Sequence, residues 1–217
     1  MSMTADELAK KQAIIDACRR MNALGINQGT SGNISVRHVD GLLVTPTSVP
    51  YDAMTPDQIV FMAMDGTHAP HQKPSSEWRF HRDILKSRPD VNAVVHAHPT
   101  YCTILAIMGM EIPPVHYMIA AAGGESIRCA SYATFGTAEL SDHAVRALEG
   151  RLACLLDHHG MIAMGKTLDK AMWLAVEVET LARQYHGCLQ IGRPPLLPSD
   201  EIERVRRRMA GYGLSEG

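Results

Sequence analysis

The spacing of hydrophobic residues predicts two long helices, one near each end of the chain. Over residues 5–24 apolar side chains recur every three or four positions, and Thr4 and Glu7 form a capping box that starts a helix. The second helix runs over residues 167–189, where the apolar set keeps helical spacing until prolines break the chain. After them, Ser199 starts a last helix.

Short apolar runs between the long helices predict strands. Asp40-Gly41 is a hairpin signal between runs at 34–37 and 42–45. Further strands are expected at 59–64, 91–98, 152–156 and 161–164, shorter helices at 77–85, 100–108 and 141–148, and a loop or short helix at 117–124. Because strands and helices interleave without a long linker, the sequence predicts a single α/β domain over residues 1–217, a layer sandwich with a mostly antiparallel sheet.

Composition indicates a folded protein and disfavours nucleic-acid-binding and membrane functions. The chain has 46% hydrophobic and 20% charged residues, which is typical of a folded globular protein. Its 21 Lys and Arg against 23 Asp and Glu leave no basic surplus, which disfavours nucleic-acid binding. No apolar run reaches the roughly 18 residues of a membrane helix, and the polar N-terminus lacks a signal-peptide pattern, so we expect a cytoplasmic protein without membrane partners.

Candidate chemistry lies among the 11 histidines, since the five cysteines contain no CxxC pair. His96 and His98 end an apolar run that is predicted to be a strand, so both imidazoles face the same side and could chelate one metal ion. Two exposed strand histidines are the alternative. A second run ends in His158-His159, of which one could complete three nitrogen ligands, and spacing does not choose between them.

Glu77 has two compatible interpretations. It is expected in the first turn of its helix, where a carboxylate is favourable against the helix dipole. It could also complete a metal site or act as a base.

Three segments are typical of anion binding, although glycine-serine loops are usually only turns. Residues 29–33 offer unobstructed backbone N–H groups, residues 45–48 offer hydroxyls after a strand, and Ser75-Ser76 opens a helix. Together with a histidine metal site they indicate a phosphorylated substrate beside a Lewis acid.

The chain resembles the class II (zinc-dependent) aldolase/adducin family, and within it the fuculose 1-phosphate aldolase type. Seven ordered motifs between Leu24 and Tyr212 carry the resemblance: NQGTSGNISVR, TPTSVPY, KPSSEWRFH, VNAVVHAHPTYCT, IPPVHYMIAAAGG, YATFGT and LLDHHGMIA. It implies a three-layer α/β/α sandwich around a mostly antiparallel sheet. It also implies a homotetramer with active sites between subunits.

The resemblance further implies a set of site residues. One Zn²⁺ per subunit would be bound by His96, His98, His159 and Glu77, with Glu77 also the catalytic acid/base. Tyr117 would reach a neighbouring subunit's site as a catalytic residue, and Tyr212 would contact the substrate from a mobile C-terminal tail of about residues 200–217. Phosphate would be bound by Gly32, Asn33, Thr47, Ser48, Ser75 and Ser76.

Two positions depart from the family pattern. Thr47-Ser48 stands where fuculose enzymes have Thr-Gly, and Ser215 stands where a basic residue is usual. The resemblance implies cleavage of a ketose 1-phosphate to dihydroxyacetone phosphate and an aldehyde such as lactaldehyde as the expected reaction. Alternatives are ribulose, 5-deoxyribulose or 5-methylthioribulose 1-phosphate as substrate, an epimerase, dehydratase or decarboxylase on a sugar phosphate, and an adducin-like scaffold, which the retained histidines and Glu77 disfavour.

Overall fold

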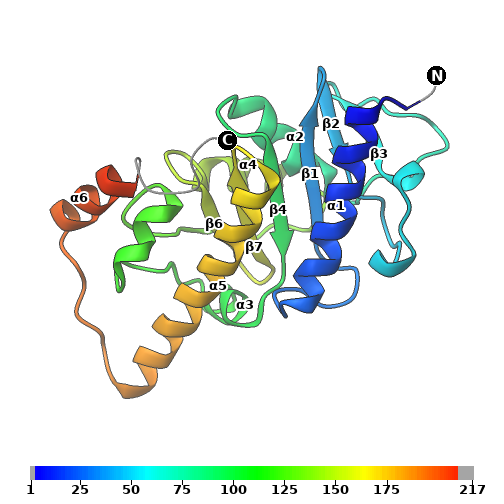
Figure 1. Cartoon of the computed structure of the whole chain (residues 1–217). Helices are drawn as coiled ribbons and strands as arrows, with labels where there is room; N and C mark the ends of the chain where they lie inside the picture. The colour runs from blue at the N-terminus through cyan, green and yellow to red at the C-terminus, as the bar shows by residue number, and fades with distance from the viewer. Residues whose placement is uncertain (1–2, 210–217) are drawn as a thin grey trace.

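The computed structural model describes residues 3–209 and builds them around one seven-stranded sheet (Figure 1). The strand order is β3-β2-β1-β4-β7-β6-β5, and every neighbouring pair is antiparallel except β5 with β6. The mostly antiparallel sheet that the sequence predicted is confirmed. The strands are β1 (Asn33–His38), β2 (Gly41–Val44), β3 (Val60–Ala63), β4 (Ala93–Ala97), β5 (Cys129–Ala130), β6 (Ala153–Leu156) and β7 (Gly160–Gly165).

Helices cover both faces of the sheet, so the molecule is a three-layer α/β/α sandwich, as expected. One face carries α1 (Ala5–Ala23), α3 (Thr100–Ile107) and α5 (Leu168–Ile191), and the other carries α2 (Trp78–Ser87) and α4 (Ala138–Ala147). At one end of the molecule, α6 (Ser199–Met209) packs against the 3-10 helix η3 (Tyr117–Ala122). Two further 3-10 turns, η1 (Tyr51–Ala53) and η2 (Pro56–Gln58), precede β3.

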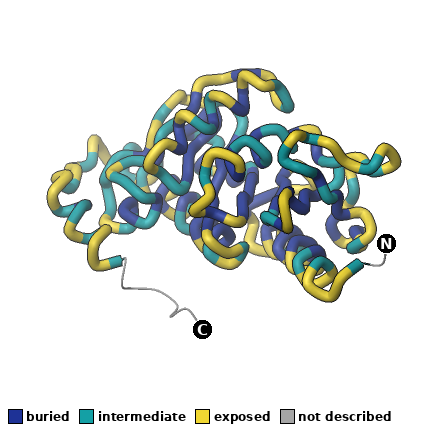
Figure 2. Tube along the Cα trace, turned by 90° about the horizontal axis from the view of Figure 1, so that it is seen from above, coloured by how far each residue is buried: buried dark blue, intermediate teal, exposed yellow. Residues whose placement is uncertain are grey.

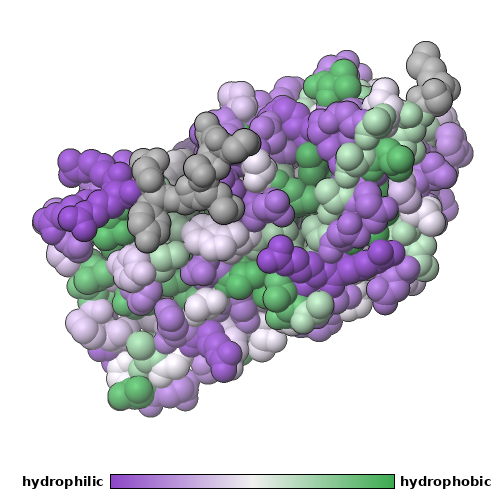
Figure 3. Space-filling model, in the orientation of Figure 1, coloured by the Kyte–Doolittle hydropathy of each residue, from purple (hydrophilic) through white to green (hydrophobic). Residues whose placement is uncertain are grey.

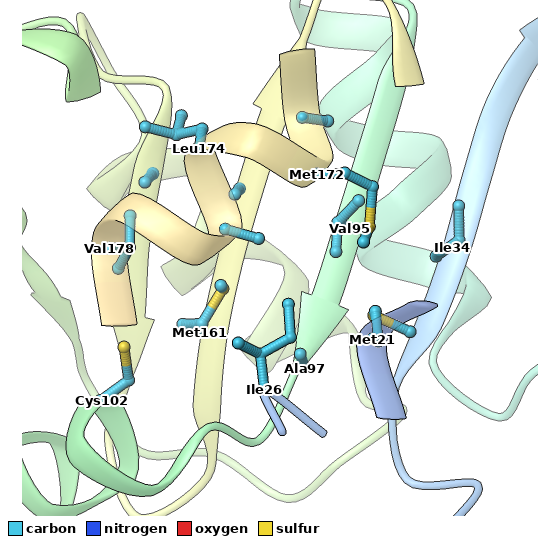
Figure 4. Close-up of a cluster of buried hydrophobic side chains, with 14 of the residues drawn as sticks. Met21, Ile26, Ile34, Val95, Ala97, Cys102, Met161, Met172, Leu174 and Val178 are labelled. Carbon is cyan, nitrogen blue, oxygen red and sulfur yellow. The ribbon is translucent and has the colours of Figure 1, made fainter. Parts of the chain in front are cut away.

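Each face of the sheet has its own apolar core. The larger core lies under α1, α3 and α5, and Figure 4 shows Met172 of α5 beside Val95 of β4. The second core lies under α2 and α4. Because strand side chains alternate, Val94 of β4 joins the second core and His96 continues that row at the strand end. The same alternation that fills the core therefore places an imidazole at the edge of the α2 layer.

Buried residues lie along the middle of the molecule and exposed ones around its rim (Figure 2). On the face that carries α1 and α5, hydrophilic and hydrophobic residues are mixed, with hydrophilic residues gathered over α6 (Figure 3). Across residues 3–209, no helix combines the length and hydropathy needed to cross a bilayer.

Several element boundaries differ from those expected. The hairpin turn lies one residue earlier, at Val39-Asp40, so that Gly41 pairs with His38 inside the ladder. Helix α4 starts at Ala138 rather than 141, because the Thr137 side chain accepts a hydrogen bond from the Leu140 N–H and caps it there. The two-residue strand β5 was not predicted, since so short a run carries no periodicity.

The start of α3 is held by a residue from a distant helix. Glu179 of α5 accepts hydrogen bonds from the backbone N–H groups of Tyr101 and Cys102, at 2.9 and 2.8 Å. A carboxylate there satisfies donors that the helix itself leaves unpaired, since the N-cap residue is Pro99 and makes no side-chain cap. This contact fixes the chain directly after His98.

Candidate metal centre and active site

Four side chains from three separate segments meet beyond the end of β4, at the lower end of that strand in Figure 1. His96 is the last residue but one of the strand, His98 directly follows the strand, His159 lies in the turn between β6 and β7, and Glu77 directly precedes α2. One ligand atom from each lies within 4.8 Å of all the others. The structure thus brings together all four residues that the resemblance implied as metal ligands.

The three imidazoles form a symmetric cage. Each pair of ring centroids is 4.8 Å apart, and Nε2 of His96 lies 2.9 Å from Nε2 of His98. Glu77 closes the cage, with Oε2 at 3.2 Å from His96 Nε2 and Oε1 at 3.2 Å from His159 Nε2. Three nitrogen ligands and one carboxylate are a donor set that suits Zn²⁺ in a tetrahedral site.

The polar atoms of the cage show that a cation fits. Glu77 Oε1 is buried and has no hydrogen-bond partner among the described residues. Such an acceptor costs free energy unless a partner is supplied. A divalent ion among the four side chains would supply it.

The protonation states also suit metal binding. Burial, reinforced by the neighbouring rings, lowers the pKa of His98 to about 3 and that of His159 to about 4, so both are neutral near pH 7. Burial alone would raise the pKa of Glu77, but His96, His159 and Asn33 outweigh it and hold that pKa below its usual value. Neutral imidazoles and an ionised carboxylate are the forms that ligate metals.

A backbone carbonyl orients His96. Its Nδ1 lies 2.9 Å from the Met161 carbonyl oxygen, so Nδ1 carries the proton and donates it. The lone pair is then on Nε2, which faces the cage.

The turn between β6 and β7 decides which of the adjacent histidines enters the cage. His158 has φ +53°, a left-handed conformation that is uncommon for a non-glycine residue. This turn leaves His158 exposed and paired with Asp157, while the side chain of His159 is only 14% exposed. Spacing left this choice open and the family resemblance implied His159; the structure places His159 in the cage.

The sequence predicted Glu77 in the first turn of α2. In the structure it is the residue directly before the helix. Its side chain makes no cap hydrogen bond and turns to the histidines instead, while Ser75 Oγ accepts a hydrogen bond from the Glu77 N–H. A favourable interaction with the helix dipole therefore does not by itself explain the position of Glu77. Its carboxylate contacts the histidines of the cage.

Sequence reasoning missed a buried polar row behind Glu77. Asn33 Nδ2 donates to Glu77 Oε2 at 2.9 Å, His81 Nε2 lies 2.5 Å from Asn33 Oδ1, and Ser35 Oγ lies 2.8 Å from His81 Nδ1. The sequence assigned no chemical role to His81. The available signal was its spacing, since Glu77 and His81 are four positions apart at the start of one helix.

A pocket of about 370 Å³ opens beside the cage. All six residues implied as phosphate ligands line it: Gly32, Asn33, Thr47, Ser48, Ser75 and Ser76. The Thr47 N–H donates to the Lys73 carbonyl and the Ser75 N–H to the Thr45 carbonyl, which ties two of these segments together. No lysine or arginine is among the described residues that line the pocket.

Two positions in these loops have specific backbone demands. A Cβ on Gly32 would lie 2.7 Å from the His96 carbonyl oxygen, so only glycine lets this loop meet the end of β4. Ser48 has φ +59°, a conformation that glycine adopts more readily. The positive φ of Ser48 would suit the glycine that the resemblance implies for fuculose enzymes at this position, from which this chain departs.

One implied catalytic residue, Tyr117, is not brought to the cage. Tyr117 is half exposed on η3, stacks beside His116, and is not among the residues that line the pocket. Tyr212 lies outside the described residues. Conversely, Tyr132, Phe135 and His158 line the pocket. The sequence assigned no role to Tyr132 and Phe135 and considered His158 only as a possible metal ligand. Tyr132 and Phe135 are large aromatic side chains that are exposed to solvent. The hydrophobic periodicity of the sequence does not reveal this exposure, so the sequence could not identify them.

We predict that Gly160→Ala weakens metal binding by about tenfold or more. A Cβ there would lie 2.5 Å from the Ala97 carbonyl oxygen and 2.7 Å from His98 Cδ2, so the His98 ring must move. Metal titration of the apoprotein measures the effect. Gly187→Ala is the control, because its Cβ would meet nothing within 4 Å. Equal affinity of the two variants would contradict the prediction.

We also predict a pH dependence of stability that depends on His81. Burial lowers its pKa to about 3, whereas an unfolded histidine has a pKa of about 6.5. Between these values the unfolded chain binds the extra proton, so this contribution is full above pH 6.5 and is lost as the pH falls toward 3.

Glutamine does not titrate in this range. As the pH is lowered, the free energy of unfolding of metal-free His81→Gln should therefore fall less steeply than that of the metal-free wild type. The expected difference is about 1.4 kcal/mol per pH unit between pH 4 and 6. Urea unfolding at several pH values measures it. Parallel pH profiles of the two proteins would exclude a neutral buried His81.

Comparison with known proteins agrees with this geometry. The family model described as Class II Aldolase and Adducin N-terminal domain matches residues 12–186. A 5-methylthioribulose-1-phosphate/5-deoxyribulose-1-phosphate aldolase of Rhodospirillum rubrum is 56% identical, over 97% of this chain and 96% of that protein. An L-fuculose phosphate aldolase of Escherichia coli is 53% identical, over 98% of each chain.

Solved structures show the same fold. An L-fuculose 1-phosphate aldolase has a TM-score of 0.91 and 35% identity, covering 96% of this chain and 98% of its own. A putative aldolase/epimerase/decarboxylase from Klebsiella pneumoniae has a TM-score of 0.83 and 26% identity, covering 94% and 100%. The resemblance seen in the sequence is confirmed: the chain belongs to the class II aldolase/adducin family, and it is a class II aldolase, a carbon–carbon lyase.

Proposed function

We propose that this enzyme cleaves a ketose 1-phosphate to dihydroxyacetone phosphate and an aldehyde, with Zn²⁺ as its metal. The observation that carries the proposal is the cage of three imidazoles and one carboxylate beside a pocket of hydroxyl and backbone N–H groups. The names of the two relatives add support, because both act on ketose phosphates. Their identities of 56% and 53% are too close to choose between a fuculose and a 5-deoxyribulose or 5-methylthioribulose substrate.

Neutral donors would bind the phosphate. Ser75 and Ser76 precede α2, where free backbone N–H groups and the helix dipole favour an anion. The loop at Gly32 and the hydroxyl groups of Thr47 and Ser48 face the same pocket. A dianion there has no lysine or arginine among the described lining residues, so hydrogen bonds and the neighbouring cage would compensate its charge.

The chain's own residues would move the protons. When bound in the cage, Zn²⁺ supplies Lewis-acid stabilisation of the negative charge that develops as the C3–C4 bond breaks. Tyr117 of a neighbouring subunit would pass on the proton that leaves the C4 hydroxyl as the aldehyde forms. Glu77, ionised beforehand, would take up that proton and give it to the carbon that keeps the phosphate arm, which releases dihydroxyacetone phosphate.

This role of Tyr117 requires the homotetramer with shared active sites, which stays part of the proposal, as does the cytoplasmic location. The exposure of Tyr117 and its absence from the residues that line the pocket support a role outside its own subunit. Tyr212 keeps its proposed contact with the aldehyde end of the substrate.

We expect a panel of ketose 1-phosphates to identify the substrate. Fuculose, ribulose, 5-deoxyribulose and 5-methylthioribulose 1-phosphates are assayed for release of dihydroxyacetone phosphate with a coupled dehydrogenase. At least one should be cleaved, and a chelator should abolish cleavage until Zn²⁺ is restored. Consumption of a sugar phosphate without this product would favour an epimerase, dehydratase or decarboxylase. Protein without stoichiometric metal would favour a scaffold.

Glu77→Gln should retain much of the zinc yet lose turnover by about 10²- to 10⁴-fold, since the amide cannot transfer the proton. Metal analysis and kcat on the best substrate measure the two effects. Glu177→Gln on α5 is the matched control for loss of one carboxylate and should keep wild-type turnover. Retained turnover in Glu77→Gln would exclude the acid/base role.

A further inference from the structure

A row of buried polar side chains connects the sheet to the back of Glu77. Ser35 and His81 are fully buried and Asn33 is 4% exposed. Their contacts run in one line, from Ser35 Oγ to His81 Nδ1 at 2.8 Å, from His81 Nε2 to Asn33 Oδ1 at 2.5 Å, and from Asn33 Nδ2 to Glu77 Oε2 at 2.9 Å. Buried polar groups must be paired, so the row is not incidental packing.

The chemistry of Glu77 fixes the direction of every hydrogen bond in this row. An ionised carboxylate only accepts, so Asn33 must present its NH₂ group to it. The carbonyl of the Asn33 amide then faces His81 and needs a donor, which sets the proton on His81 Nε2. His81 Nδ1 is left with a lone pair, and the Ser35 hydroxyl donates to it.

The reverse orientation of the Asn33 amide would be costly. It would set Asn33 Oδ1 against Glu77 Oε2, with two acceptors at hydrogen-bond distance inside a buried site. Asparagine has a nearly symmetric shape, so its own packing does not select an orientation. A donor on the other side of the amide, His81, therefore reinforces the orientation that Glu77 requires.

We propose that His81 is a positioning residue, whose Nε2–H holds the Asn33 amide with its NH₂ group on Glu77. Asn33 also lines the substrate pocket, so its second N–H stays available to the phosphate group. One imidazole thereby sets both the orientation of the carboxylate and a donor for substrate. His81 itself is no metal ligand, because both ring nitrogens are engaged within the row.

The first test removes the donor. In His81→Leu we expect kcat to fall 10- to 100-fold, the range typical of residues that orient metal ligands. The visible absorption spectrum of the Co²⁺-loaded protein should change, since the Glu77 carboxylate loses its fixed orientation. His81→Gln should recover part of both properties, because its amide can donate at the place of Nε2. Ile84→Ala, buried one turn further along α2, controls for lost packing and should keep the wild-type spectrum.

The second test asks whether His81 acts through Asn33. In an Asn33→Ala background, His81→Leu should cost no further factor in kcat, because the link is already broken. Ser35→Ala serves as a milder variant that keeps the row's volume and should give a smaller change of the same kind. An unchanged Co²⁺ spectrum in His81→Leu, or an equal loss of kcat with and without Asn33, would overturn the proposal.

The kinetic part of this inference rests on the proposed function, and the spectroscopic part does not. If the wild-type protein cleaves no ketose 1-phosphate, the proposed function fails. The Co²⁺ spectra of His81→Leu, His81→Gln and Ile84→Ala would still decide the role of His81.

Discussion

The burial of one carboxylate among three imidazole rings is the constraint on which this site depends. A buried charge is tolerated only when it is paired and hydrogen-bonded. Glu77 meets His96 and His159 on one side and Asn33 on another, and one of its oxygens still has no hydrogen-bond partner among the described residues. The ends of β1 and β4, the turn before β7 and the start of α2 therefore meet at one place. There their polar side chains pair with and hydrogen-bond to the Glu77 carboxylate.

Local rules predicted the parts of this site that lie within one element. The period of two along β4 places His96 and His98 on one side, and the apolar run before them identified the strand. The choice of His159 over His158 came from the family resemblance alone. The physical reason is the left-handed backbone at His158, which no hydrophobic pattern encodes.

Contacts between distant residues account for what the sequence did not predict. His81 meets Asn33 across 48 positions of the chain, and a single histidine within an apolar helix face resembles an ordinary core residue. Glu179 caps α3 from a helix about 80 positions later. Such partners depend on how α2 and α5 pack on the sheet, which the pattern of each helix leaves undetermined.

Under the proposed function, two parts of the pocket would meet two parts of the substrate. The segments at Gly32-Asn33 and Ser75-Glu77 carry both the proposed phosphate donors and the groups that orient the cage, so a shift of either segment would disturb binding and chemistry together. The part of the pocket that Tyr132 and Phe135 line is different, because these are exposed side chains that hold no part of the cage. If the proposed function holds, substitutions of Tyr132 or Phe135 would change the aldehyde that is accepted without moving Glu77. Such a division of the pocket would be compatible with relatives that are named for different ketose phosphates and are each more than half identical to this chain.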